Sequence, residues 1–259
     1  MRTPTIFKEK NKRLLLFLHI PKCAGTTLVE EILCRRFRPE RLLTHYIAGT
    51  DVLLERLRNM SEREKRRLEC IAGHFAFGIH ELLPQPCAYI TLLRNPIERV
   101  ISHYYYAATT PRHPLYHEIK NRRLSLRQYV NDLENIEMDN GQTRLLAGIG
   151  QGAPFGQCGD HQLRKAMANL QSGFVLAGLT ERFEDFLRIL TFILNWKIPA
   201  YHSRNVTAQR PMAVDIDHET RKCIEKMNRL DRCLFEFVSA RFQDQFESMV
   251  SVSRDTLQD

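Results

Sequence analysis

The sequence has little of what marks several protein classes. Its 12 glycines and 11 prolines among 259 residues are too few for a collagen-like or low-complexity chain. No apolar run approaches the roughly 20 residues that a membrane-spanning helix needs. The 7 cysteines form no C-x-x-C pair, which argues against a structural zinc site, and an odd count is unusual for a disulfide-bonded scaffold. We therefore expect a globular chain with no membrane span and no metal site.

What the sequence does have is a large apolar fraction and a basic excess. Hydrophobic residues make up 43% of the chain, enough to fill the core of one large domain. The 38 Lys and Arg exceed the 30 Asp and Glu, which gives a net charge of +8. Such an excess favours an anionic partner: a nucleotide, an acidic glycan, nucleic acid or an anionic membrane. Residues 1–13 are interpreted as a basic N-terminal arm, ahead of one domain over residues 14–259.

Short apolar runs alternate with helical patterns along the chain. Buried strands are expected over residues 14–20, 70–75, 87–93 and 174–179. Helices are expected over residues 26–37, 53–69 with a break near 59–61, from 95 onward, 124–133, 161–171, 181–196 and 218–246 with an interruption. This alternation predicts an α/β fold with one central parallel sheet flanked by helices. Ligands of such sheets bind beyond the carboxyl ends of the strands, in the loops that follow Ile20, Phe75 and Leu93.

The first of these loops, residues 19–27, runs from a buried strand into a helix. Free N–H groups at a helix N-terminus bind anions, and Gly25 lets a ligand approach the backbone closely. Lys22 adds a mobile cation, and Thr26 and Thr27 add hydroxyl donors. The same pattern also fits an ordinary strand-to-helix turn with a capping threonine.

The loop is not a Walker A motif, because Lys22 precedes Gly25 instead of following the last glycine. The strand over 87–93 ends in Arg94, where nucleotide triphosphatases usually place a magnesium-binding aspartate. Arginine can bind phosphate through two N–H groups, and Ser102, two helical turns later, can donate another hydrogen bond. Taken separately, the two residues also fit an arginine paired with a carboxylate and a solvent-facing serine. Taken together, they favour a phosphate site without a metal.

Residues 19–27 resemble the 5′-phosphosulfate loop of the sulfotransferases that use 3′-phosphoadenosine 5′-phosphosulfate (PAPS), and residues 94–103 resemble their 3′-phosphate motif. The resemblance is to the carbohydrate branch, with its heparan sulfate 2-O enzymes and bacterial relatives, and implies the P-loop-like sulfotransferase fold. Residues 72–78 resemble the segment that supplies the catalytic histidine. Segments 139–148, 178–183 and 228–237 match as well, so the resemblance covers about residues 14–246.

The resemblance implies a cofactor site residue by residue. The 5′-phosphosulfate would be held by Lys22, Cys23, Ala24, Gly25, Thr26 and Thr27. Arg94 and Ser102 would hold the 3′-phosphate, the group that distinguishes PAPS from ATP. In the later segment 201–211, Arg210 would lie near a phosphate, with Arg204 as the alternative.

The resemblance also implies the chemistry. His74 would accept the proton of the acceptor hydroxyl, and Lys22 would stabilise charge on the departing phosphate oxygen, with no metal required. His19 is the main rival for the base, although we interpret it as a residue that shapes the turn. Glu81 and Glu98 are weaker alternatives.

We therefore expect a sulfotransferase that moves the sulfuryl group of PAPS to a hydroxyl of a carbohydrate-like acceptor and releases adenosine 3′,5′-bisphosphate (PAP). Residues 109–140 and 150–160 are expected to shape the acceptor pocket, and the remaining basic charge favours an acidic acceptor. The alternatives are a nucleotide-dependent kinase, a sulfotransferase for small molecules or peptidyl tyrosine, and a basic nucleic-acid-binding protein, for which no aromatic-basic motif is present. Cysteine usage and the short segment before the first strand predict a bacterial-like cytoplasmic protein, or a Golgi lumenal one if the chain is part of a longer protein.

Overall fold

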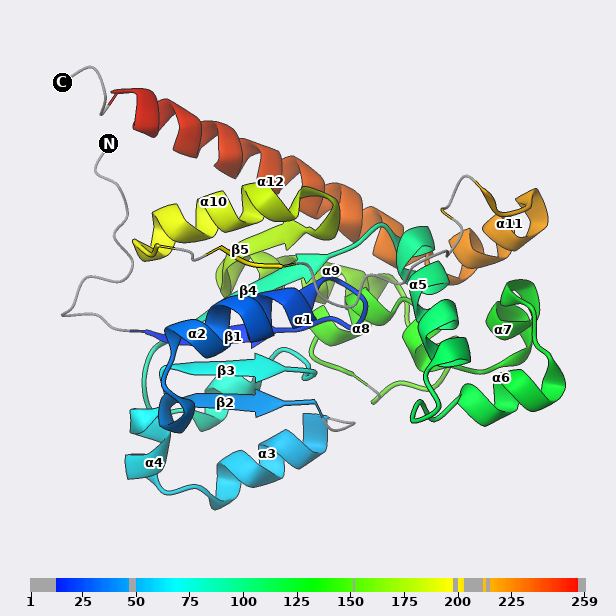
Figure 1. Cartoon of the computed structure of the whole chain (residues 1–259), viewed down its shortest axis with the longest axis horizontal. Coiled ribbons are helices and arrows are strands. Elements are labelled where there is room, and N and C mark those ends of the chain that lie inside the picture. The colour runs from blue at the N-terminus through cyan, green and yellow to red at the C-terminus, as the bar shows by residue number, and fades with distance from the viewer. Residues whose placement is uncertain are drawn as a thin grey trace.

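The fold is built on a five-stranded sheet in the order β2-β3-β1-β4-β5 (Figure 1). The computed structural model describes residues 13–46, 50–150, 152–197, 200–202, 212 and 215–255. The strands are β1 Leu14–Leu18, β2 Leu42–His45, β3 Cys70–Gly73, β4 Cys87–Leu93 and β5 Phe174–Leu179. All neighbouring strands pair in parallel, which confirms the predicted α/β fold with a central parallel sheet.

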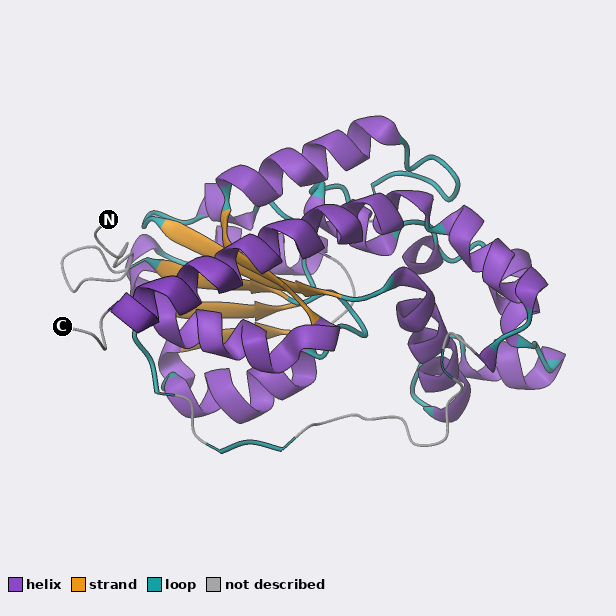
Figure 2. Cartoon of the chain, turned by 90° about the horizontal axis from the view of Figure 1, so that it is seen from above, coloured by secondary structure: helices purple, strands orange, loops and turns teal. Residues whose placement is uncertain are grey.

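Helices flank this sheet on both faces (Figure 2). They are α1 Gly25–Thr27, α2 Cys34–Arg36, α3 Thr50–Asn59, α4 Glu62–Arg67, α5 Pro96–Thr109, α6 Tyr116–Arg122, α7 Leu126–Asp132, α8 Gly141–Leu146, α9 Asp160–Ser172, α10 Phe183–Leu194, α11 His218–Met227 and α12 Arg229–Asp255. A π-helical segment, Leu28–Leu33, joins α1 to α2, so the predicted helix over 26–37 is one continuous helical stretch. The predicted breaks near 59–61 and inside 218–246 separate α3 from α4 and α11 from α12.

The short elements β2, α6 and α8 were not expected from the sequence. Each has at most seven residues, and β2 is an edge strand that pairs only with β3 among the described strands. Segments of this length carry too few periods of apolar residues to stand out from a loop. Their conformation is decided by the elements against which they pack.

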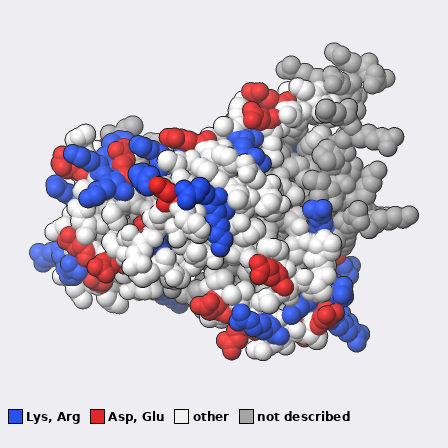
Figure 3. Space-filling model, turned by 180° about the vertical axis from the view of Figure 1, so that it is seen from behind, with Lys and Arg blue, Asp and Glu red and all other residues white. Residues whose placement is uncertain are grey.

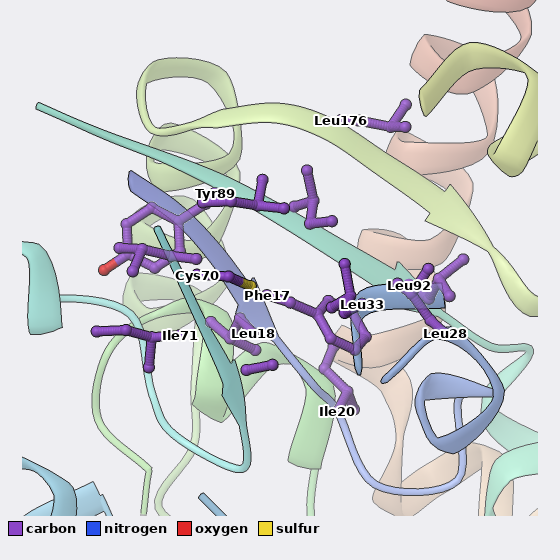
Figure 4. Packing of buried hydrophobic residues seen from close by; sticks show 14 of the residues in the cluster. Phe17, Leu18, Ile20, Leu28, Leu33, Cys70, Ile71, Tyr89, Leu92 and Leu176 are labelled. Atoms are coloured by element: carbon purple, nitrogen blue, oxygen red, sulfur yellow. The ribbon is translucent and has the colours of Figure 1, made fainter. Parts of the chain in front are cut away.

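The central strands are apolar along their whole length because both faces of the sheet are covered. All five residues of β1 are buried, and so are the last six of β4. Figure 4 shows Phe17 of β1 beside Leu33 of the helical segment that follows the first loop, and Leu28 of that segment belongs to the same apolar cluster. This packing anchors both ends of that loop, since the strand before it and the helix after it belong to one core.

A second group of helices lies beyond the carboxyl ends of the strands (Figures 1 and 2). Helices α5, α6, α7 and α11 share their own apolar cluster, which includes Val100, Ile119, Tyr129 and Ile224. The long helix α12 runs from this group back across β5. The loops at the carboxyl end of the sheet are therefore enclosed between the sheet and a helical layer.

The charged surface is mixed on the face that Figure 3 shows, where groups of Lys and Arg lie beside groups of Asp and Glu. None of the helices in the described part of the chain combines the length and the apolar character that crossing a membrane requires. The predicted basic arm, residues 1–13, lies outside the described residues except for Arg13.

Candidate functional site

A cavity of about 780 Å³ opens at the carboxyl ends of β1, β3 and β4. It is lined by most of the predicted site residues: Lys22, Ala24, Gly25, Thr26, His74, Arg94 and Ser102. Two predicted residues, Cys23 and Thr27, are buried and do not line it. Arg210 and Arg204 lie outside the described residues. Three loops that are far apart in the sequence thus meet at one cavity.

The loop between β1 and α1 has the backbone geometry of an anion site. Lys22 and Ala24 both have positive φ, at 68° and 56°, so that the chain turns sharply before the helix. Successive N–H groups in such turns form concave anion-binding nests. Ala24 is the N-cap of α1 and supplies no side-chain hydrogen bond. The alternative of an ordinary turn with a capping threonine therefore does not describe this loop.

Gly25 is required by the close approach of His19. A Cβ atom at position 25 would lie 2.0 Å from His19 Cδ2 and 2.2 Å from His19 Nε2. The His19 ring also stacks on Phe17, with 5.4 Å between the ring centroids, so it is confined from the side opposite the loop. His19 thus shapes the turn by packing directly against its glycine, as expected from the sequence.

We expect Gly25→Ala to lower the melting temperature and to weaken PAP binding, because the added methyl group displaces the His19 ring or the loop. Overpacking of this kind costs roughly 1–3 kcal/mol. The double variant Gly25→Ala with His19→Ala should bind PAP better than Gly25→Ala alone, since the smaller side chain removes the clash. Titration of PAP by calorimetry and a thermal melt measure both effects.

Gly159→Ala is the matched control, because its Cβ would come no closer than 3.7 Å to the side chain of Gln162, an ordinary van der Waals contact. It should leave both the melting temperature and the affinity for PAP close to those of the wild type. Equal losses in the two glycine variants would show that the contact with His19 is not what matters at position 25.

The Gln142 side chain contacts both predicted cofactor loops. Its side-chain oxygen accepts a hydrogen bond from the Arg94 N–H at 3.0 Å, and its amide nitrogen donates to the Arg94 carbonyl oxygen at 2.9 Å. The Cys23 thiol lies 3.7 Å from the same side-chain oxygen. Burial raises the pKa of the Cys23 thiol to about 12, so this cysteine stays neutral and structural. Gln142 belongs to the segment 139–148 that resembles the sulfotransferase family, but the sequence did not predict its contact with Arg94.

Arg94 follows the end of β4 and lines the cavity, and its guanidinium group is held by two neighbours. One guanidinium nitrogen donates to the Lys22 carbonyl oxygen at 3.1 Å, and the other lies 3.5 Å from a carboxylate oxygen of Glu98. The carboxylate pairing that the sequence left open is therefore present, although Arg94 still lines the cavity. Ser102 lies on α5. It is buried rather than solvent-facing, and it lines the same cavity. Arg94 and Ser102 thus face one space, as a phosphate site requires.

Lys22 projects over an aromatic ring across the cavity. Its Nζ atom lies 3.8 Å from the centroid of the Tyr106 ring on α5. A cation over the face of an aromatic ring is held by electrostatic attraction that is worth roughly 0.5–2 kcal/mol. This contact keeps the ammonium group at the mouth of the loop, where an anionic ligand would meet it.

His74 follows β3 and is positioned by the neighbouring strands. Its backbone N–H donates to the His45 carbonyl oxygen at 2.8 Å. Gly73 allows β3 to approach β2 at this point, because a Cβ atom at position 73 would lie 1.9 Å from the same carbonyl oxygen. The Nδ1–H of the ring donates to the His19 carbonyl oxygen at 2.7 Å. A carbonyl oxygen only accepts hydrogen bonds, so Nδ1 carries the proton and Nε2 is left with the basic lone pair.

Electrostatics favour the neutral form of His74. Burial lowers the pKa of His74 below its ordinary value, and this effect outweighs the hydrogen bond to the His19 carbonyl, which raises it. Burial lowers the pKa of His19 still further, and its Nδ1 atom is buried without a hydrogen-bond partner. His74 therefore has the geometry of a general base, whereas His19, which also lines the cavity, is only 3% exposed.

The two carboxylates considered as alternative bases, Glu81 and Glu98, do not lie at the cavity. Glu98 is engaged with Arg94, and neither Glu98 nor Glu81 lines the cavity. Glu137 does line it, in the turn between α7 and α8. No motif or periodicity around Glu137 marks it in the sequence, because only the packing of the second helical layer brings it to the cavity.

Comparisons with known proteins show the family to which the chain is similar. The galactose-3-O-sulfotransferase family model matches residues 3–256 of the chain. Heparan-sulfate 6-O-sulfotransferase 1 of Homo sapiens is 27% identical over 291 residues, which cover 93% of this chain and 68% of the human protein. Heparin sulfate O-sulfotransferase of Drosophila melanogaster is 23% identical over 259 residues, which cover 92% of this chain and 74% of the fly protein.

Among solved structures, the chain is similar to the crystal structure of mouse sulfotransferase SULT7A1 complexed with PAP. The sequence identity is 15% and the TM-score is 0.41, and the match covers 84% of this chain and 64% of that chain.

The family match confirms the predicted resemblance to carbohydrate sulfotransferases and the prediction of an enzyme. The prediction of a bacterial-like cytoplasmic protein is wrong, because the similar proteins are animal heparan-sulfate sulfotransferases. That prediction depended on cysteine usage and on the length of the segment before the first strand, and neither feature identifies the source of a protein.

Proposed function

The chain belongs to the galactose-3-O-sulfotransferase family and is a PAPS-dependent carbohydrate sulfotransferase, and we propose that the cavity at the carboxyl ends of β1, β3 and β4 is its active site. The observation that carries this proposal is the convergence of Lys22, His74 and Arg94 on one cavity from three separate loops. When bound there, PAPS supplies the sulfuryl group that is transferred.

The loop from Lys22 to Thr26 would hold the 5′-phosphosulfate end. The loop turns through positive φ at Lys22 and Ala24, the first turn of α1 has no side-chain cap, and Lys22, Ala24, Gly25 and Thr26 line the cavity, so backbone N–H groups of this turn would be donors to the anion. Lys22 would leave the Tyr106 ring to stabilise charge on the departing phosphate oxygen, a role worth roughly 3–4 kcal/mol. The backbone N–H group of Ala24 is part of the same proposal, whereas Cys23 donates its N–H to the Ile20 carbonyl oxygen at 3.3 Å and packs its side chain inward.

Arg94 and Ser102 would hold the 3′-phosphate. Arg94 is partly enclosed, with 14% of its side chain exposed, so its charge is less screened than that of a surface arginine. Gln142 locks the backbone of Arg94 by two hydrogen bonds, which supports the geometry of the guanidinium group. PAP would be the product, and the positive charges of Lys22 and Arg94 would neutralise its phosphates.

His74 would accept the proton of the acceptor hydroxyl at Nε2 while Nδ1–H stays bound to the His19 carbonyl oxygen. The hydrogen bond to a backbone carbonyl oxygen fixes both the orientation of the ring and its tautomer, as in other catalytic histidines. The acceptor would be a carbohydrate of the class that the heparan-sulfate relatives modify, and it would enter past the segments 113–115 and 135–137 that line the cavity.

Sulfate transfer from radiolabelled PAPS to a panel of glycans, small alcohols and tyrosyl peptides tests this proposal. We expect labelled product with at least one glycan and none with tyrosyl peptides. In parallel, PAP should raise the melting temperature more than ADP does, because only PAP carries the 3′-phosphate. Equal shifts by PAP and ADP, with no labelled glycan, would contradict the proposed site.

A further inference from the structure

One carboxylate faces a cavity that otherwise gathers cations. Among the described residues that line the cavity, Glu137 is the only Asp or Glu, whereas Lys22, Arg94, Arg99 and Arg144 line it as well. The side chain of Glu137 keeps 43% of its surface exposed, although its Oε2 atom on the His103 side is buried, so a ligand would reach the carboxylate from its exposed part.

Glu137 is held from three directions. Its N–H donates to Asn135 Oδ1 at 3.0 Å, and its carbonyl oxygen accepts a hydrogen bond from the Arg99 guanidinium group. Its Oε2 atom lies 2.8 Å from His103 Nε2. The other ring nitrogen of His103 lies 2.6 Å from the hydroxyl oxygen of Tyr129, to which Asn135 Nδ2 donates at 3.2 Å. A carboxylate with this many fixed neighbours is preorganised for a ligand.

The carboxylate is charged at neutral pH. Burial alone would raise the pKa of Glu137, but the interaction with His103, together with the charge of Arg99, lowers it to about 2. An anion beside a phosphosulfate site repels the cofactor instead of binding it, because like charges repel strongly where solvent is scarce. Glu137 therefore suits a ligand other than the cofactor.

We propose that Glu137 binds hydroxyl groups of the acceptor sugar and determines acceptor specificity, with His103 and Tyr129 as positioning residues. This inference rests on the proposed active site. An ionised carboxylate only accepts hydrogen bonds, so its ligand must supply donors, and the hydroxyls of a sugar ring do so. Pro114 and Ile136 line the cavity too and offer apolar surface to the C–H face of such a ring. The same charge disfavours an acceptor with a carboxylate or sulfate at this position.

The test uses PAP-loaded protein titrated with methyl β-glucoside and methyl β-glucuronide, which differ only in the group at C6, with binding followed by saturation-transfer NMR. We expect the wild type to bind the glucoside more tightly than the glucuronide. Glu137→Gln should weaken binding of the glucoside roughly tenfold, because hydrogen bonds to a charged group are stronger than neutral ones. The same variant should reduce the difference between the two sugars and should not weaken PAP binding, because it removes a negative charge that repels the cofactor.

Matched variants separate this role from a general loss of structure. Glu134→Gln changes an exposed carboxylate three residues away and should alter neither ligand. Tyr129→Phe removes the hydroxyl beside His103 without touching the cavity, and should weaken glucoside binding less than Glu137→Gln does. Unchanged sugar binding by a folded Glu137→Gln variant overturns the inference. A lower turnover number with unchanged sugar affinity also overturns it, since Glu137 would then act in the chemical step. Failure of the wild type to bind PAP would refute the proposed active site itself.

Discussion

His74→Ala should lower the turnover number by roughly 10²–10⁴-fold while the affinity for PAP stays close to that of the wild type. The reason is the proposed role of His74 as general base: its Nδ1–H is occupied by the His19 carbonyl oxygen, so Nε2 carries the lone pair that would take the hydroxyl proton. Single-turnover sulfate transfer from PAPS, alongside calorimetric titration with PAP, measures the two quantities separately.

The pH dependence of kcat/KM tests the proposed role of His74 independently. A general base works in its unprotonated form, so the rate falls as the pH drops through the pKa of that group. Because burial holds the pKa of His74 below the ordinary value of 6.5, we expect kcat/KM to be level at neutral pH and to decline only below pH 6.5. His161→Ala, an exposed histidine on α9 that does not line the cavity, is the control and should retain full turnover. Undiminished turnover of His74→Ala would exclude it as the base.

Arg94→Ala should abolish the preference for PAP over AMP and ADP. Loss of the guanidinium group removes charge-assisted hydrogen bonds worth about 1.5–3 kcal/mol, which corresponds to a roughly 10–150-fold weaker affinity for PAP. The affinity for AMP, which lacks the 3′-phosphate, should change much less. Competitive displacement of a labelled nucleotide by PAP, ADP and AMP measures the preference directly.

Arg122→Ala is the matched control for this substitution. Like Arg94, Arg122 pairs with a glutamate four residues away, in this case Glu118 at 2.7 Å, but it lies on the exposed surface of α6. Its removal should leave nucleotide binding unchanged. If Arg94→Ala still discriminates between PAP and ADP, the 3′-phosphate binds elsewhere. If Arg94→Ala melts far below Arg122→Ala, its hydrogen bond to the Lys22 carbonyl oxygen stabilises the fold as well.

The local features of the sequence predicted most of the fold. Strand β4 begins and ends where its apolar run does, and Asn95 and Pro96 start α5 as a cap and a first-turn proline. These features are local, since burial on both faces selects a continuous apolar run and the first turn of a helix selects its own capping residue. The edge strand β2 escaped prediction because its four residues take their conformation from β3.

The sequence by itself determined the two loops to which we assign the cofactor, because the proposed phosphate-binding pattern lies in short continuous segments: Lys22 to Thr27, and Arg94 to Ser102. Only the tertiary structure decided how those loops are supported and what faces them. Gln142 reaches Arg94 from another element, His19 explains Gly25 by contact, and Glu137 enters the cavity from the second helical layer. Such contacts join residues distant in sequence, and the packing of helices around the sheet, which no single segment specifies, brings them together.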